Sequence, residues 1–122
     1  MVGAQDIPGR AHWEPNTDLY ATDDGLVIKV ELAGMRSEHL EITTEGTRLR
    51  LSGHRPDSCR SAHCNFLAME ITYGPFEKIL NLSADYDLSR AKAAYLNGFL
   101  RIDVPLAQRR SPERKLEISE GT

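Results

Sequence analysis

The 122-residue sequence has no long hydrophobic run, since no uninterrupted apolar stretch exceeds four residues. A helix needs about 20 apolar residues to cross a bilayer, so we expect no membrane span. The sequence has only two cysteines, which excludes a disulfide framework. Its 15 Lys and Arg against 18 Asp and Glu give a net charge of −3. Because those cations form no basic stripe, we expect no nucleic-acid partner.

Motifs that carry catalysis are also missing. The sequence has no Gly-x-Ser-x-Gly elbow, no P-loop and no His-Glu-x-x-His. The adjacent acids Asp23 and Asp24, and the pair Asp85 and Asp87, stand beside expected turns, where carboxylates usually bond their own backbone. We therefore expect no enzyme activity and no cofactor. The first residues lack the basic and apolar regions of a secretory signal, so the expected location is cytoplasmic.

What the sequence does contain is apolar alternation with a period of two, which indicates β-strands. Leu26, Ile28 and Val30 share one parity, while Val27 and Lys29 take the other. The same reasoning predicts strands over residues 13–20, 26–32, 39–44, 47–52, 67–73, 76–82, 91–96 and 99–104. Short strands at such spacing, separated by turn signals, predict an all-β fold, a two-layer immunoglobulin-like β-sandwich.

The predicted strands also divide the chain. Residues 13–105 form the expected sandwich domain, preceded by a short arm over residues 1–12 that carries no aromatic side chain. Residues 54–66 lose the alternation and are polar, so we expect a loop that projects from the core. Residues 106–122 are rich in charge and follow Pro105, which ends the last strand, and they read as a flexible C-terminal extension.

The projecting loop holds four potential zinc ligands: His54, Cys59, His63 and Cys64. Thiolate and imidazole together are a legitimate zinc set, and the two cysteines form an alternative redox-sensitive disulfide. Their spacing matches no familiar zinc knuckle, and adjacent ligands at 63 and 64 are awkward for one tetrahedron. We expect a polar loop without metal, and both alternatives stay open.

A four-residue signature then links the sequence to a known family. Ala93, Asn97, Gly98 and Leu100 fill the Ala-x-x-x-Asn-Gly-x-Leu places that small heat-shock proteins carry ahead of the last strand of their α-crystallin domain. Asn-Gly suits a turn with positive φ values, which agrees with that position. Residues 30–35, 49–53 and 73–78 also resemble stretches of this family, so the resemblance covers most of residues 19–105.

The resemblance implies a function and an assembly. Members of this family are ATP-independent holdases that bind partly unfolded client proteins and suppress their aggregation. In the bacterial and plant branch, a long loop and strand cross to a second copy, which implies a strand-exchanged homodimer here. Lys78 stands where the family usually has Arg, and it is the candidate dimer contact.

The resemblance also implies how dimers join. Leu116 and Ile118, two residues apart, are similar to the family's Ile-x-Ile anchor, which fills a groove on a neighbouring dimer. The matching groove here is expected to be lined by Leu40, Ile42 and Leu96. The alternative function is a p23-like co-chaperone, an adaptor that shares the sandwich and binds a folded partner.

Overall fold

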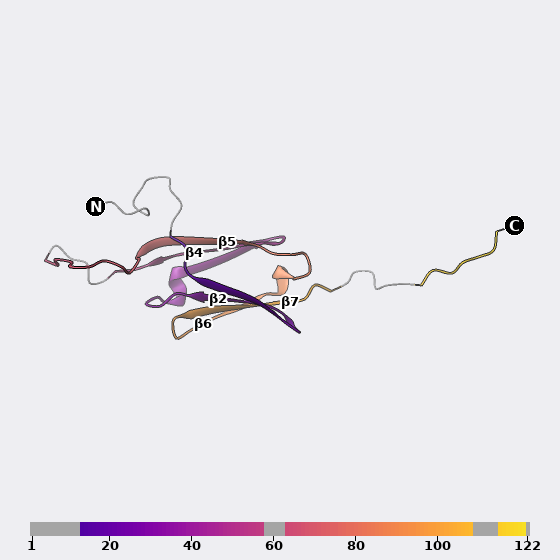
Figure 1. Cartoon of the computed structure of the whole chain (residues 1–122), viewed down its shortest axis with the longest axis horizontal. Coiled ribbons are helices and arrows are strands. Elements are labelled where there is room, and N and C mark those ends of the chain that lie inside the picture. Colours follow the sequence, from indigo (N-terminus) through magenta and orange to yellow (C-terminus); the bar gives the residue numbers. More distant parts are fainter. Residues whose placement is uncertain (1–12, 58–62, 109–114, 122) are drawn as a thin grey trace.

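The computed structural model describes residues 13–57, 63–108 and 115–121, and it shows a two-layer β-sandwich (Figure 1). This confirms the fold class predicted from the alternation. In these residues the elements follow in the order β1 (Thr17–Thr22), β2 (Gly25–Glu31), η2 (Ser37–His39), β3 (Leu40–Glu45), β4 (Arg48–Arg55), β5 (Gly74–Asn81), η3 (Leu88–Arg90), β6 (Lys92–Leu96) and β7 (Phe99–Pro105).

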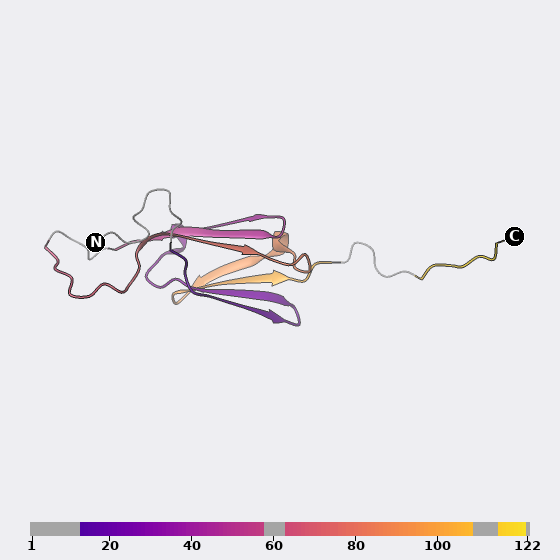
Figure 2. The ribbon, with the colours of Figure 1, turned by 45° about the horizontal axis from the view of Figure 1, so that its top comes forward.

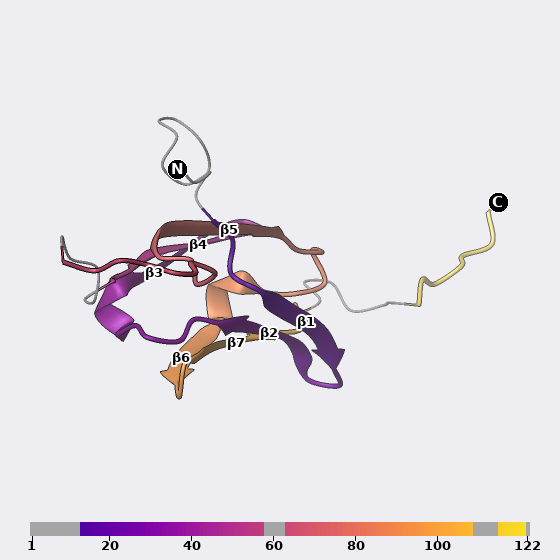
Figure 3. The ribbon, with the colours of Figure 1, turned by 60° about the vertical axis from the view of Figure 1, so that its left-hand side comes forward.

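The strands form two antiparallel sheets. One sheet has the order β1-β2-β7-β6 and the other has the order β3-β4-β5, and Figures 2 and 3 show them as facing layers. Residues 63–73 leave one end of this sandwich, whereas β7 runs out at the opposite end toward the C-terminus (Figure 1). The loop and the tail therefore leave the domain far from each other.

The core lies between the sheets and follows the predicted parity. Ile28 and Val30 of β2 are fully buried, and Phe76 of β5 is fully buried against them from the other sheet. Burying a side chain of this size stabilises the fold by about 2–3 kcal/mol. Val27 departs from the prediction, because it lies on the outer face yet is only 3% exposed. Tyr20 and Asp103 flank it from the neighbouring strands.

The first strand begins later than the sequence predicts. β1 starts at Thr17, while Trp13 forms a single parallel bridge with Phe76 in the other sheet. Pro15 lies between Trp13 and Thr17 in the sequence. It is buried and has no N–H to donate to a ladder. Residues 13–16 therefore cross from one sheet to the other instead of extending the strand.

The predicted strand over residues 67–73 is wrong for a single chain, because these residues form no strand. Their apolar side chains are exposed: Leu67 by 95%, Met69 by 58% and Ile71 by 65%. A strand needs a neighbour that accepts and donates its ladder hydrogen bonds. No strand of the described residues takes this place beside the segment.

Candidate functional site

The signature turn joins β6 to β7 and has the predicted geometry. Asn97 has a φ of 52° and Gly98 a φ of 83°, so both central residues adopt the positive φ that this hairpin turn requires. The Gly98 carbonyl accepts a hydrogen bond from the Leu32 N–H at 2.7 Å. A Cβ at Gly98 would lie 3.2 Å from the Ala33 Cα, so the turn packs closely on the segment that follows β2.

The other two signature residues lie on the inner face of the sheet. Ala93 pairs with Ile102 in β6 and β7, and Leu100, which is 3% exposed, pairs with Tyr95. The Tyr95 hydroxyl donates to the Leu32 carbonyl at 2.5 Å, which ties the edge strand β6 to the end of β2. Sequence reasoning missed Tyr95, although it has the same parity as Ala93.

The candidate groove lies along the outer strands of the two sheets. β3 and β6 are each the last strand of their sheet, and η3, which leads into β6, contacts β3. Leu40 and Ile42 of β3 are half-buried against the core. Leu96 is 70% exposed and pairs with Phe99 on the outer face of its sheet. In the structure, Leu40 and Ile42 therefore lie together against the core, whereas Leu96 lies on the outer face of the other sheet.

Lys78 lies on the edge strand β5 and points to the inner face of its sheet, since its partner in β4 is the buried Leu51. It is half-buried, whereas the flanking Glu77 receives the Arg50 guanidinium on the outer face, with Arg50 Nη2 2.6 Å from Glu77 Oε2. The structure therefore places Lys78 at the rim of the core, on an outer strand.

The tail residues lie beyond the sandwich. Leu116 is 67% exposed and Ile118 is 94% exposed, and residues 115–121 form no strand. The start of the tail is fixed: Ala107 N–H donates to the Asp85 carbonyl at 2.7 Å, and Arg90 Nη2 donates to the Leu106 carbonyl at 2.8 Å. Two exposed apolar side chains thus follow a firmly held starting point.

Asp87 binds Arg90, the residue that contacts the start of the tail. Its Oδ1 accepts the Ser89 N–H at 3.0 Å, which caps η3, and its Oδ2 accepts from Arg90 Nε at 2.9 Å. The hydrogen bonds from Ser89 and Arg90 lower the pKa of Asp87 below its usual value. This acid has the local backbone role expected of a turn carboxylate.

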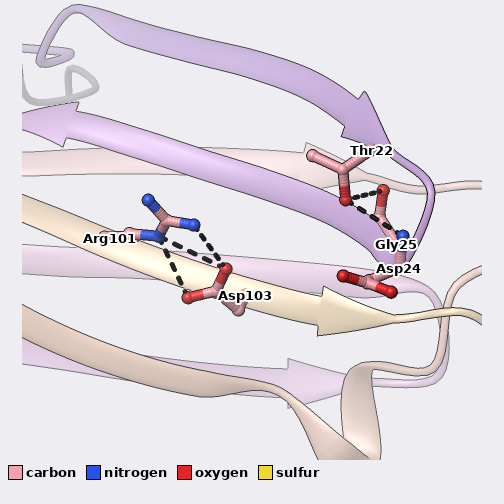
Figure 4. A network of polar contacts seen from close by, with 5 residues as sticks. All are labelled: Thr22, Asp24, Gly25, Arg101 and Asp103. Carbon is pink, nitrogen blue, oxygen red and sulfur yellow. Dashed lines mark hydrogen bonds and ion pairs between the residues drawn. The ribbon is translucent and has the colours of Figure 1, made fainter.

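A cleft of about 660 Å³ opens where the β1–β2 turn meets the end of β7. Its charged lining residues are Asp24, Arg90, Lys92 and Asp103, so acids and bases balance. Figure 4 shows Asp103 paired with Arg101, with Arg101 Nη2 3.1 Å from Asp103 Oδ1. That hydrogen bond and charge raise the pKa of Arg101. The charged side chains that line the cleft therefore carry no net charge.

The Thr22 hydroxyl, also at this cleft, donates to the Gly25 carbonyl at 3.5 Å and accepts the Asp24 N–H at 3.2 Å (Figure 4). These bonds stabilise the β1–β2 turn. The hydroxyl thus has a local structural role, and among residues 13–57, 63–108 and 115–121 the cleft is lined by no His or Cys that would activate it.

Three of the four potential zinc ligands of the loop lie among the described residues. Cys59 lies outside the described residues, while His54, His63 and Cys64 are exposed. Within the described part of the chain, no group of three or more His, Cys, Asp and Glu side chains is arranged to hold a metal ion. No helix in that part is long and apolar enough to cross a membrane.

Comparison with known proteins places this geometry in a family. The Hsp20/alpha crystallin family model matches residues 18–119. A small heat shock protein C2 of Rickettsia felis is 28% identical over 104 residues, covering 85% of this chain and 67% of the relative. A 16.9 kDa class I heat shock protein of Triticum aestivum is 32% identical over 104 residues, covering 84% and 69%. Other relatives are covered over 64% of their length.

Solved structures agree on the fold. A small heat-shock protein from Xylella fastidiosa aligns with a TM-score of 0.76 at 24% identity, covering 90% of this chain and all of that one. The hspA protein from Xanthomonas axonopodis aligns with a TM-score of 0.72 at 26% identity, covering 79% and 96%. The sandwich, the Asn-Gly turn and the match over residues 18–119 lead to one conclusion: the chain belongs to the Hsp20/alpha crystallin family.

Proposed function

We propose that the chain is an ATP-independent holdase that binds partly unfolded proteins and keeps them from aggregating. The observation that carries the proposal is that two segments outside the sheets, the loop and the tail, expose large apolar side chains: Phe66, Leu67, Met69, Ile71, Leu116 and Ile118. Unfolding proteins expose apolar surface, and covering that surface competes with their aggregation. Membership of the Hsp20/alpha crystallin family supports this function.

The proposed unit is a homodimer made by strand exchange. The segment over residues 67–73 alternates apolar and polar side chains, as a strand does, yet it lacks a neighbour within the described chain. β1 is the last strand of its sheet, so its outer edge offers unpaired backbone groups. Addition of this segment to β1 of a second copy would satisfy both backbones and cover the apolar side chains. Lys78, on the outer strand β5, is the proposed dimer contact at the rim of the core.

Dimers are proposed to join through their tails. Leu116 and Ile118 lie two residues apart, so both side chains reach one face of an extended segment. The proposed receiving groove runs along β3 and β6 and is lined by Leu40 and Ile42, with Leu96 at its outer side. The related protein of Xylella fastidiosa is described as having a distinct high-order structure, which supports assembly beyond a dimer.

The test is light scattering of a heat-labile enzyme such as citrate synthase, with ATP omitted, beside the mass of the protein alone. We expect suppressed aggregation and a mass of a dimer or more. A monomer that suppresses nothing would refute the holdase and favour the p23-like adaptor, which needs neither exchange segment nor anchor. An oligomer that suppresses nothing would refute holdase activity while leaving the assembly standing.

A further inference from the structure

Three side chains from distant parts of the sequence meet at the base of the long loop. Arg55 ends β4, where the loop begins, and Tyr73 precedes β5, where the loop returns. The Arg55 guanidinium carbon lies 4.5 Å from the Trp13 ring centroid and 5.7 Å from the Tyr73 ring centroid. A planar cation within about 6 Å of an aromatic face is attracted to it, so Arg55 contacts both rings at once.

Arg55 also binds the returning limb of the loop through its hydrogen bonds. Its Nε donates to the Thr72 carbonyl at 2.8 Å, and its Nη2 donates to the same oxygen. Its Nη1 lies 3.5 Å from the Ala33 carbonyl. A charged fork on a backbone carbonyl is stronger than a neutral hydrogen bond. The outgoing and returning limbs of the loop are therefore joined at their base.

Trp13 closes the outer edge of β5 beside this point. Its carbonyl accepts the Glu77 N–H at 3.1 Å, and its indole Nε1 donates to the Gly74 carbonyl at 3.1 Å. Its ring packs on Phe76 with centroids 5.2 Å apart. Because an uncovered edge invites pairing with other chains, Trp13 blocks β5 as a place for an incoming strand at this end. Figure 3 shows β5 and β1 as the outer strands on the same side.

We propose that Arg55 is a positioning residue for self-association. By joining Trp13 to Thr72 and Tyr73, it holds the base of the exposed segment over residues 67–71. A segment whose base is already ordered loses less conformational freedom on binding a second copy. Trp13 meanwhile directs that segment away from β5 and toward β1. This inference rests on the strand-exchanged dimer proposed above.

The first experiment compares full-length wild type with Arg55→Lys and with the control Arg48→Lys by sedimentation over a dilution series. Lysine keeps the charge but loses the fork and the flat surface. Arg48 is exposed at the opposite end of β4 and pairs with Asn81. Loss of a hydrogen bond from a charged donor predicts about a tenfold rise in the dimer dissociation constant for Arg55→Lys. Arg48→Lys is expected to match wild type.

The second experiment needs no variant, because Trp13 is the only tryptophan. Its emission in the wild type is followed through the same dilution series. If the exchange segment and Trp13 are coupled through Arg55, the emission maximum shifts with the same midpoint as dissociation. A constant emission would overturn the proposal even where Arg55→Lys fails to fold.

The outcomes separate two failures. Dimers whose dissociation is unchanged in a folded Arg55→Lys, or a Trp13 emission that stays constant through the dissociation midpoint, would overturn the role of Arg55 and leave the dimer intact. A wild type that is monomeric at every concentration would overturn the dimer itself, and the positioning role with it. A weakened Arg55→Lys dimer together with a matching Trp13 shift supports the proposal.

Discussion

Replacing Gly53 with alanine should destabilise the domain strongly, although the change adds only one methyl group. Gly53 lies in β4 opposite Leu40 of β3. A Cβ placed there lies 2.3 Å from the His39 carbonyl oxygen and 2.6 Å from the Phe76 Cζ, below the 3.0 Å that real Cβ atoms keep. The oxygen belongs to the backbone where η2 meets β3, so it moves only if β3 moves with it.

Overpacking a core costs about 1–3 kcal/mol, and the backbone contact puts Gly53→Ala near the upper end. For a domain of this size, about 1 kcal/mol shifts the melting temperature by roughly 4 °C, so we expect a fall of roughly 10 °C. The assay is thermal unfolding followed by circular dichroism at fixed protein concentration, because assembly also shifts the midpoint.

The control is Ser52→Ala, one position earlier on β4, where the half-buried side chain takes the opposite face. It is expected to shift the midpoint much less. A second substitution, Phe76→Leu in the Gly53→Ala background, removes the ring contact but leaves the His39 oxygen in place, so it is not expected to restore stability. Equal midpoints for Gly53→Ala and Ser52→Ala would refute the steric argument.

Three further predictions concern the tail, an acid and the signature turn. Replacing Leu116 and Ile118 together with alanine should reduce larger assemblies to dimers in light-scattering mass measurements, and an unchanged size distribution would contradict the anchor. Hydrogen bonding from Ser89 holds the pKa of Asp87 below the ordinary 3.8, so its stabilisation is present above that value and is lost as the pH falls through the lowered pKa. Asp87→Asn should therefore flatten the acid limb of a plot of melting temperature against pH. An unchanged slope would show that this carboxylate does not contribute to the loss of stability in acid. Asn97 has a φ of 52°, so Asn97→Ala should cost about 1 kcal/mol in chemical denaturation while Asn97→Gly costs less; equal losses would show that φ is not the cause.

The core was predictable because one physical rule controls it. In a sheet with one buried face, every second residue must be apolar, and Ile28, Val30 and Ile102 obey this rule with exposures of 1% or less. The Asn97-Gly98 turn was predictable for a similar local reason, since positive φ restricts the residue type. Such features need no knowledge of distant contacts.

Features that depend on distant contacts were not predictable. Trp13 bridges to Phe76, 63 positions later, and no local pattern places these two together. The Arg55 contacts with Trp13 and Thr72 depend on three separate segments meeting. The family resemblance suggested Leu96 as a groove residue because its strand borders the groove, yet its register with Phe99 puts it on the outer face. Pairing register across strands decides the face, and a single strand does not contain it.

The segment over residues 67–73 has a local strand pattern, but whether it forms a strand depends on contacts with distant residues. Its alternation is as regular as that of β7, yet it forms no strand in the described chain. Alternation reflects burial of one face, and nothing in the described part of the chain buries Leu67, which is 95% exposed. The neighbouring edge of β5 is already occupied by Trp13, so the segment has no place there. A strand pattern without a strand therefore favours a partner surface on another molecule, and the edge of β1 in a second copy has the unpaired backbone that such a segment needs.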